Sequence, residues 1–308
     1  MPAQAEFAIL RRMESARSLT EKYPTAFGIA CGAGAALFWA LGFVAARQGV
    51  TSGLSPLVIA LHRFAWPGLA LFPLVARNNF ADLRMIGIGR AAALALFGGL
   101  PLALLSYAGY VLVPLGHGAV IQPSCAAFGG LVLARLVLKE PLPARRIVGA
   151  AIIVIGLIVI GAEALRTIGT HGLVGDFLFV AAGSFFAIFG ILVRRWRLGA
   201  IRAAALTSVV SLVGLPILLF SFDDMLAAGF YENAMQAVVQ GVLAGAGAIF
   251  LFTWSVVYLG ASRAVLFPSL VPPFTLLIGY FTIGEAPSVS QLVGLVIVLA
   301  GFRLTQRT

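Results

Sequence analysis

The stretch His117-Gly-Ala-Val-Ile-Gln-Pro-Ser124 recurs 145 residues further on as Ser262-Arg-Ala-Val-Leu-Phe-Pro-Ser269. In both copies, two residues separate an Ala-Val pair from a Pro-Ser pair, near the start of a long apolar run. The same offset aligns three further pairs, which are Glu140 with Glu285, Gly149 with Gly294 and Gly156 with Gly301. Chance similarity between apolar segments is the alternative explanation. Matched Pro-Ser and Glu positions at one spacing instead favour a duplicated chain.

The copies lie within a series of apolar segments, each of which is about as long as a membrane-crossing helix. Because half of ten is five, an odd number, the second copy would enter the membrane from the opposite side. The sequence therefore predicts an all-α polytopic membrane protein with two inverted five-helix repeats, an arrangement typical of secondary transporters. The ten predicted spans are 24–46, 56–76, 91–113, 118–138, 146–163, 173–193, 203–222, 235–258, 262–283 and 288–303.

Composition supports this interpretation. Of the 308 residues, 61% are hydrophobic and 10% are charged, whereas a soluble domain has about 25% charged residues. A soluble enzyme or soluble binding module is therefore excluded. The net charge of +10 does not indicate nucleic-acid binding, because the basic residues form short clusters between apolar runs. A β-barrel is not expected, because its strands alternate over short segments.

The basic residues predict the orientation, since Lys and Arg accumulate in cytoplasmic loops. With a cytoplasmic N-terminus, 18 of the 21 Lys and Arg residues fall on the cytoplasmic side. Both termini then lie in the cytoplasm, and the protein is expected in the inner membrane of a bacterium. The outer loop 223–232 carries Asp223, Asp224 and Glu232 without a basic residue.

Three parts of the chain are expected: a cytoplasmic segment 1–23, a first repeat 24–163 and a second repeat 164–308, the repeats forming one transmembrane domain. Residues 1–23 lack a signal-peptide h-region. They form either a helix on the membrane surface, with Phe7, Leu10 and Met13 on one face, or a solvated tail.

Several short motifs occur in a fixed order: Phe38-Trp-Ala-Leu-Gly-Phe-Val-Ala-Ala-Arg47, then His62-Arg63-Phe64, then the duplicated Pro-Ser units, each followed by a Glu and a Gly-rich helix. In this order they resemble the EamA family of the drug/metabolite transporter superfamily, and most of all its YddG-type exporters of aromatic amino acids. Lys139-Glu140 departs from the Gly-Glu that is usual in the family, and Gly284-Glu285 keeps it. The resemblance implies a ten-helix secondary transporter that exports small amphipathic metabolites, first of all aromatic amino acids, by alternating access.

No catalytic constellation is apparent, so an enzyme is not expected, and neither is a metal or cofactor. The acids Glu140, Glu163, Asp176 and Glu285 lie at the ends of spans, which argues against a carboxylate proton relay at the midplane. A facilitator or a weakly coupled carrier follows, with proton coupling through His62 or His117 left open. The two cysteines, Cys31 and Cys125, are interpreted as buried apolar residues.

Arg63 is the one charge well inside a predicted span, where an arginine costs about 2.5–3.5 kcal/mol to insert. Two roles remain open: a structural contact near the outer end of its span, or contact with the substrate. His62 points to another helix face, and a role at the lipid interface or in the structure is expected for it rather than a ligand role.

Aromatic residues recur at helical spacing in spans 1, 3, 6 and 8, which line the central cavity in the fold that the resemblance implies. Their rings could stack on an aromatic substrate or hold a cation. An aromatic belt at the membrane surface, or plain packing, is the alternative. The candidate substrate-binding aromatics are Trp39, Phe43, Tyr107, Phe185, Phe189 and Trp254.

Proline interrupts spans 4 and 9 at matched positions. A proline frees a backbone carbonyl, which within a membrane must face protein or water. Gln122, Ser124 and Ser269 are therefore candidates for the polar ends of a zwitterion. Pro123, Pro268, Pro272 and Pro273 are candidate hinges or helix breaks, and packing kinks are the alternative.

The expected partners are a small-molecule substrate and the lipid bilayer, with no nucleic acid. Small-xxx-small patterns such as Gly28-x-x-x-Gly32 are expected to pack helices within one chain, which favours a monomer over a dimer. Two other functions remain open: export of organic cations or drugs, and a membrane-embedded enzyme that modifies lipids.

Overall fold

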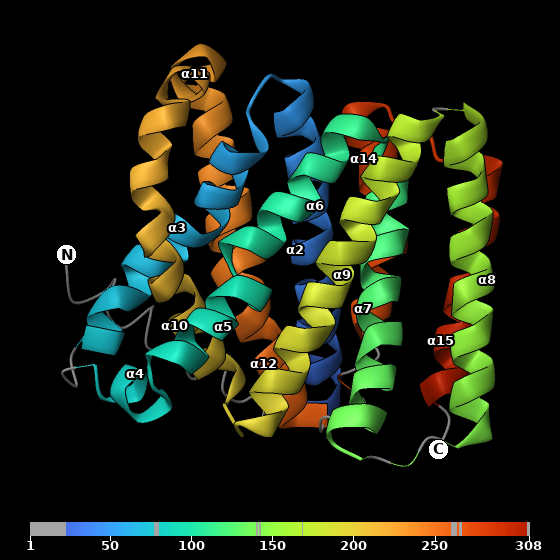
Figure 1. Ribbon diagram of the computed structural model, residues 1–308, viewed down its shortest axis with the longest axis horizontal. Helices are drawn as coiled ribbons and strands as arrows, with labels where there is room; N and C mark the ends of the chain where they lie inside the picture. The colour runs from blue at the N-terminus through green and yellow to red at the C-terminus, as the bar shows by residue number, and fades with distance from the viewer. Residues whose placement is uncertain are drawn as a thin grey trace.

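The computed structural model describes residues 23–76, 80–139, 141, 143–167, 169–259, 264 and 267–306. These residues form helices joined by short turns, with no strand among them, and this confirms the all-helical fold class (Figure 1). The alternatives for residues 1–22, and the matched residues Glu140 and Arg263, lie outside the described part.

Each of the ten predicted apolar segments contains helix. The first five segments hold α2 (Pro24–Thr51), α3 (Pro56–Ala76), α5 (Ile88–Gly98) with α6 (Leu100–Leu112), α7 (Leu115–Val137) and α8 (Ala144–Thr167), and the short α4 (Ala81–Ile86) precedes α5. The last five hold α9 (Thr170–Arg195), α10 (Ala200–Ser211) with η1 (Leu212–Ser221), η2 (Ala237–Gly247) with α12 (Ala248–Leu259), η3 (Phe267–Leu270) with α14 (Val271–Ile283), and α15 (Val289–Gln306); α11 (Phe222–Gln236) leads into η2.

Five helical stretches in the described part are long and apolar enough to cross a membrane by length and composition. They are Pro24–Thr51, Ile88–Leu112, Leu115–Val137, Thr170–Arg195 and Phe222–Leu259, and shorter apolar helices span Ala200–Pro216, Phe267–Ile283 and Val289–Leu304. The chain is therefore a multi-pass helical membrane protein.

The helices form a bundle with two distinct ends (Figure 1). The upper end of Figure 1 holds α11, the C-terminal end of α2 and the turn after α14, whereas α4 and the C-terminal ends of α7 and α12 lie at the lower end. α2 packs against α12, α14 and η2, and α9 packs against α7, α6 and α5. Within the described helices, neither α2 nor α12 packs along α5 or α9.

Four of the predicted segments depart from a regular α-helix, and one of them, the ninth, begins with the 3₁₀-helix η3. Gly99 separates α5 from α6, and Pro101 follows in the first turn of α6. The seventh segment continues as the 3₁₀-helix η1 around Pro216, and the eighth opens with the π-helix η2. π-turns are rare overall, but those that occur are often found at functional sites. The helix η2 is therefore of interest for the site described below.

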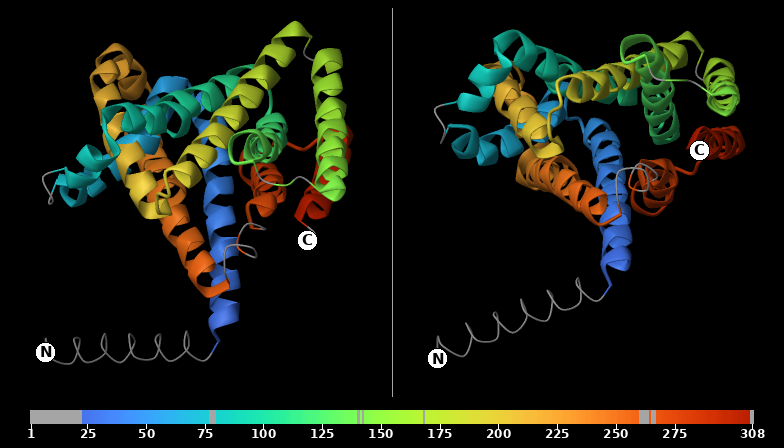
Figure 2. Two further views of the ribbon diagram at one scale, coloured as in Figure 1. Left: turned by 60° about the horizontal axis from the view of Figure 1, so that its bottom comes forward. Right: turned by 90° about the horizontal axis from the view of Figure 1, so that it is seen from below.

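Glycines bring α8 and α15 into backbone contact at one edge of the bundle (Figure 2, right). A methyl group on Gly156 would come 2.9 Å from the carbonyl oxygen of Gly294, and one on Gly301 would come 2.7 Å from that of Gly149. The two helices therefore approach as closely as small residues allow. Ile153 and Val298 are fully buried at this crossing.

Candidate functional site

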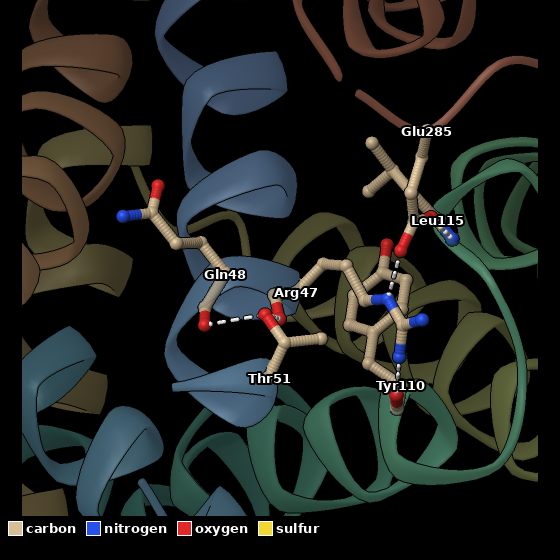
Figure 3. A network of polar contacts seen from close by, with 6 residues as sticks. All are labelled: Arg47, Gln48, Thr51, Tyr110, Leu115 and Glu285. Carbon is tan, nitrogen blue, oxygen red and sulfur yellow. Dashed lines mark hydrogen bonds and ion pairs between the residues drawn. The ribbon is translucent and has the colours of Figure 1, made fainter. Parts of the chain in front are cut away.

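An ion pair between Arg47 and Glu285 fastens the upper end of the bundle (Figure 3). Arg47 lies in the last two turns of α2, and its Nε donates to Oε1 of Glu285 at 2.6 Å. Its Nη1 donates to the carbonyl oxygen of Tyr110 on α6 at 2.5 Å. The second carboxylate oxygen of Glu285 accepts from the backbone N–H of Leu115, the first residue of α7, at 2.7 Å. A carboxylate is favourable there, because the first N–H groups of a helix lack partners within it.

Two glutamines at the start of η2 hold it against α2. The amide of Gln240 donates to the carbonyl oxygen of Gly42 at 2.7 Å, and the amide of Gln236 donates to that of Ala45 at 2.7 Å. The hydroxyl of Tyr107, on α6, donates to Oε1 of Gln240 at 2.9 Å. Both glutamines are fully buried, so these contacts join three helices inside the protein.

Arg63 on α3 reaches the same cluster. A methyl group on Gly42 would come 3.4 Å from Nη1 of Arg63 and 3.5 Å from Oε1 of Gln240, so the guanidinium lies beside both residues. Tyr107, which donates to Gln240, belongs to the same cluster. Among the described residues, no hydrogen bond or ion pair reaches the Arg63 side chain, which is partly buried.

His62 lies on another face of α3 and is hydrogen-bonded at both ring nitrogens. Its Nδ1 accepts from the indole of Trp66 at 2.9 Å, so the proton of the neutral ring lies on Nε2, 3.2 Å from Oδ1 of Asn233. Asn233 in turn donates to the carbonyl oxygens of Met225 and Gly229. These contacts dock α11 against α3.

His117 and Asp176 form a buried pair between α7 and α9. Nδ1 of His117 lies 2.9 Å from Oδ1 of Asp176, and the side chains are 2% and 9% exposed. Oδ2 of Asp176 has no partner among the described residues. The pair stabilises the packing of α7 on α9 in the upper half, where Tyr110 also stacks near Phe179.

The predicted aromatic residues separate into two groups. On the α2–α12 side, Trp39 packs against Phe252 with centroids 5.6 Å apart, and Trp254 packs against Phe27 at 5.7 Å. Trp254 keeps 52% of its surface exposed. Phe43, one turn above Trp39 on α2, approaches Tyr110 at 6.5 Å.

The second group lies between α5 and α9. Phe185 packs edge-on against Phe97 at 5.0 Å, and the ring of Phe189 fills the space beside Gly98, which has no side chain. Five of the six aromatic candidates thus belong to two helix pairs, α2–α12 and α5–α9, that do not pack along each other, whereas Tyr107 lies on α6 and contacts Gln240.

The polar candidates of α7 face the protein interior. The hydroxyl of Ser124 donates to the carbonyl oxygen of Val120 at 2.6 Å, within its own helix. Gln122 is buried, and its Oε1 has no partner among the described residues. Pro123 lies inside the continuous helix α7.

The matched prolines of the second half occupy a different structure. Pro268 and Ser269 lie in the short 3₁₀-helix η3, and Pro272 and Pro273 lie in the first turn of α14, where proline is tolerated. The two proline-containing segments therefore differ in conformation between the halves of this structure.

The structure places Arg63 beside Gln240, which is hydrogen-bonded to Tyr107 and which sequence reasoning missed. Gln236 and Gln240 lie four residues apart in an otherwise apolar segment, and this spacing of buried amides was the available signal. The pairing of Arg47 with Glu285 was also missed, because 238 residues separate them.

These features define a polytopic helical membrane protein with polar groups buried between its helices. The sequence model of the EamA-like transporter family matches residues 26–162 and, a second time, residues 173–306. The chain therefore belongs to the EamA-like transporter family, within the drug/metabolite transporter superfamily.

Relatives agree with this assignment. The chain is 25% identical over 287 residues to an uncharacterized transporter of Archaeoglobus fulgidus, covering 88% of this chain and 95% of the relative. It is 24% identical over 274 residues to the uncharacterized transporter YdfC of Bacillus subtilis, covering 87% of each. A solved structure, titled only as the crystal structure of a protein, shares the fold, with a TM-score of 0.58 at 16% identity, covering 91% of this chain and 97% of that one. Family and relatives point to a membrane transporter rather than an enzyme.

Proposed function

We propose that this protein is a secondary transporter that exports small amphipathic metabolites, with aromatic amino acids as the first substrate class, by alternating access. The observation that carries the proposal is the division along α2. Its C-terminal part, from Gly42 onwards, is fastened by polar contacts to α6, η2 and Glu285, whereas Trp39, near the middle of the helix, packs against an aromatic ring of α12.

Two inverted repeats of five spans are part of this proposal. The family model matches each half separately. Equivalent helices of the two halves also exchange their packing partners. α7 packs on α9, and the equivalent helix α14 packs on α2. Likewise α6 packs on α9, and the equivalent helix α12 packs on α2. The close contacts of Gly156 with Gly294 and of Gly149 with Gly301 exchange in the same way under the offset of 145.

The substrate would bind between the helix pairs α2–α12 and α5–α9. Each pair presents aromatic rings, and stacking on such rings favours a phenyl or indole group. Because these pairs do not pack along each other, a small molecule between them need not displace a helix–helix contact. Gln122, Ser124 and Ser269 remain proposed contacts for the polar ends, and the four prolines remain proposed hinges.

The polar contacts at the upper end support a conformation that is closed at that end. Under the orientation given by the basic residues, the upper end faces outwards and both termini lie in the cytoplasm of a bacterium. The structure then corresponds to a carrier closed to the outside, ready to receive a cytoplasmic substrate. Opening outwards would require separation of Arg47 from Glu285.

Flux measurements in liposomes test the proposal. Purified protein should accelerate the movement of labelled phenylalanine, tyrosine and tryptophan above the rate in protein-free liposomes. The same assay with and without an imposed pH gradient separates facilitated from proton-coupled transport. No acceleration for any of the three amino acids would refute the aromatic amino acid assignment.

Organic cations are a second candidate substrate class. The exposed face of Trp254 favours them, because an aromatic face attracts a cation. Tetraphenylphosphonium, added as a competitor in the same flux assay, would abolish amino acid movement if both share one site. Uptake of the cation without amino acid movement would favour this second class.

A further inference from the structure

We propose that Arg63 is an anion-binding residue of the transport site and holds the carboxylate of the transported solute. This inference rests on the proposed function, since it names the chemical group by which a transported solute is recognised. Tyr107 and Gln240 act as positioning residues, because they lie beside the guanidinium and are hydrogen-bonded to each other.

The charge of Arg63 lacks a partner within the described part of the chain. An arginine remains protonated in proteins, and a charge within a membrane protein is costly unless it is paired. Arg47 shows how this chain treats an arginine with a structural role, since two of its nitrogens are hydrogen-bonded. Arg63 has no such contact, although it lies deeper in its segment.

The described acidic residues of the upper half do not pair with Arg63. Asp176 faces His117, Glu232 accepts from Gln236, and Glu285 holds Arg47. On α11, Asp223 is exposed and Asp224 is half-buried. None of these carboxylates contacts Arg63, so an anion that neutralises this guanidinium must come from outside the described residues. A solute that carries its own carboxylate provides one.

The hydrogen bonds around Arg63 also favour an acceptor as its ligand. The hydroxyl proton of Tyr107 is used by Gln240, and the amide of Gln240 is used by the carbonyl oxygen of Gly42. The hydroxyl proton of Tyr107 and one of the two amide protons of Gln240 are therefore occupied, whereas the five N–H groups of a guanidinium require acceptors. A carboxylate matches their planar, forked geometry.

The position of Arg63 fits an amphipathic solute. Gly42, which lies beside the guanidinium, is three residues from Trp39 on α2, so both lie on neighbouring positions of one helix face. At 1.5 Å per residue, Trp39 is about 4.5 Å further towards the lower end. A carboxylate at Arg63 thus leaves the rest of the solute next to the aromatic part of α2. The rare π-helix η2, which carries Gln240, is a further mark of a functional site.

Binding of three related probes to purified protein in nanodiscs tests this inference, with isothermal titration calorimetry as the measurement. L-phenylalanine carries both polar groups, 3-phenylpropionate carries the carboxylate alone, and 2-phenylethylamine carries the amine alone. The wild-type protein should bind both carboxylates and should bind 2-phenylethylamine at least about tenfold more weakly, because hydrogen bonds to a charged group contribute about 1.5–3 kcal/mol. Equal affinity for all three probes in the wild-type protein would overturn the inference without any variant.

Substitutions assign the preference to Arg63. Arg63→Gln should reduce carboxylate binding about 10- to 100-fold and leave 2-phenylethylamine unchanged, whereas Arg63→Lys should retain part of the affinity. Arg90→Gln, on the exposed start of α5, removes the same charge and should bind like the wild type. Full carboxylate preference in a folded Arg63→Gln protein would also overturn the inference.

The experiment separates this inference from the proposed substrate class. If the aromatic probes fail to bind, aliphatic carboxylates such as L-leucine and lactate are tested in the same way. Binding of either that is lost in Arg63→Gln supports the anion subsite and refutes the aromatic preference. Absence of any carboxylate binding refutes the subsite.

Discussion

Glu285 and Arg47, 238 residues apart in the chain, form a 2.6 Å ion pair that joins the second half of the protein to the first. The carboxylate has a second task, because its other oxygen accepts from the N–H of Leu115 at the start of α7. The residues are therefore not equivalent: loss of Glu285 leaves the Arg47 guanidinium without a counter-charge and the N-terminus of α7 without its side-chain acceptor.

This asymmetry predicts different effects of the two alanine substitutions. Glu285→Ala should lower the free energy of unfolding by about 3 kcal/mol, because it removes the counter-charge of Arg47 and the acceptor at the α7 N-terminus. Arg47→Ala should lower it by less, because the remaining carboxylate keeps its favourable contact with that helix N-terminus. Thermal unfolding of the purified variants measures the difference. The free energy of unfolding of the double variant should differ from that of Glu285→Ala by at most a few tenths of a kcal/mol. Strictly additive losses would contradict this coupling.

Gly156→Ala and Gly301→Ala should destabilise the protein to a similar extent. Each new methyl group would meet a backbone carbonyl on the facing helix, which cannot turn aside as a side chain does, so a loss of about 1–3 kcal/mol is expected. Gly190→Ala in α9 is the matched control, because its methyl group would meet nothing within 4 Å. That control should be neutral or slightly stabilising, since alanine favours a helix. Unfolding temperatures that do not distinguish the three variants would refute the close crossing.

Asp176→Ala should destabilise the packing of α7 on α9. The substitution leaves buried His117 without its partner, at a cost of about 1–3 kcal/mol. Asp223→Ala, on the exposed surface of α11, is the control and should change stability little. Unfolding temperature and helix content measured by circular dichroism report the effect. An Asp176→Ala protein as stable as the control would show that the pair contributes no stability.

Trp39→Ala and Trp254→Ala should weaken transport of tryptophan more than transport of a small aliphatic amino acid, because the lost ring contributes stacking of about 0.5–1.5 kcal/mol. Phe281→Ala, with 74% exposure on α14, removes a ring outside the proposed site and should leave transport unchanged. The measurement is the initial rate of flux in liposomes. An unchanged rate for Trp254→Ala would remove that residue from the site.

Hydropathy and duplication predict where helices lie, because the length and apolar character of a membrane helix are local properties of the sequence. The α-to-π change at η2 could not be predicted in this way, since Gln236 and Gln240 meet their partners only after α2 is in place. Likewise, matched prolines suggested matched kinks, but Pro123 lies inside α7 and Pro268 lies in a 3₁₀-helix. Sequence equivalence therefore does not require equal conformation.

The sequence identifies Arg63 as an unusual charge within a span, but it does not identify the residues that surround it. Its neighbours Tyr107 and Gln240 come from two other helices, and no local pattern joins them. The side chain of Ser124 illustrates the opposite case: its hydroxyl bonds to the preceding turn of α7, a local contact that serines in helices commonly make.

The wide turns of η2 also set the rotational phase of α12. Each π-turn closes a longer loop of backbone than an α-turn, so re-forming these turns as α-helix would rotate α12 about its own axis. The glutamines at the start of η2 are anchored to α2, which means that the rotation would be transmitted to Trp254 and its neighbours. A change of helix type in η2 would in this way rotate the aromatic side chains of α12 while the polar contacts between η2 and α2 stay in place.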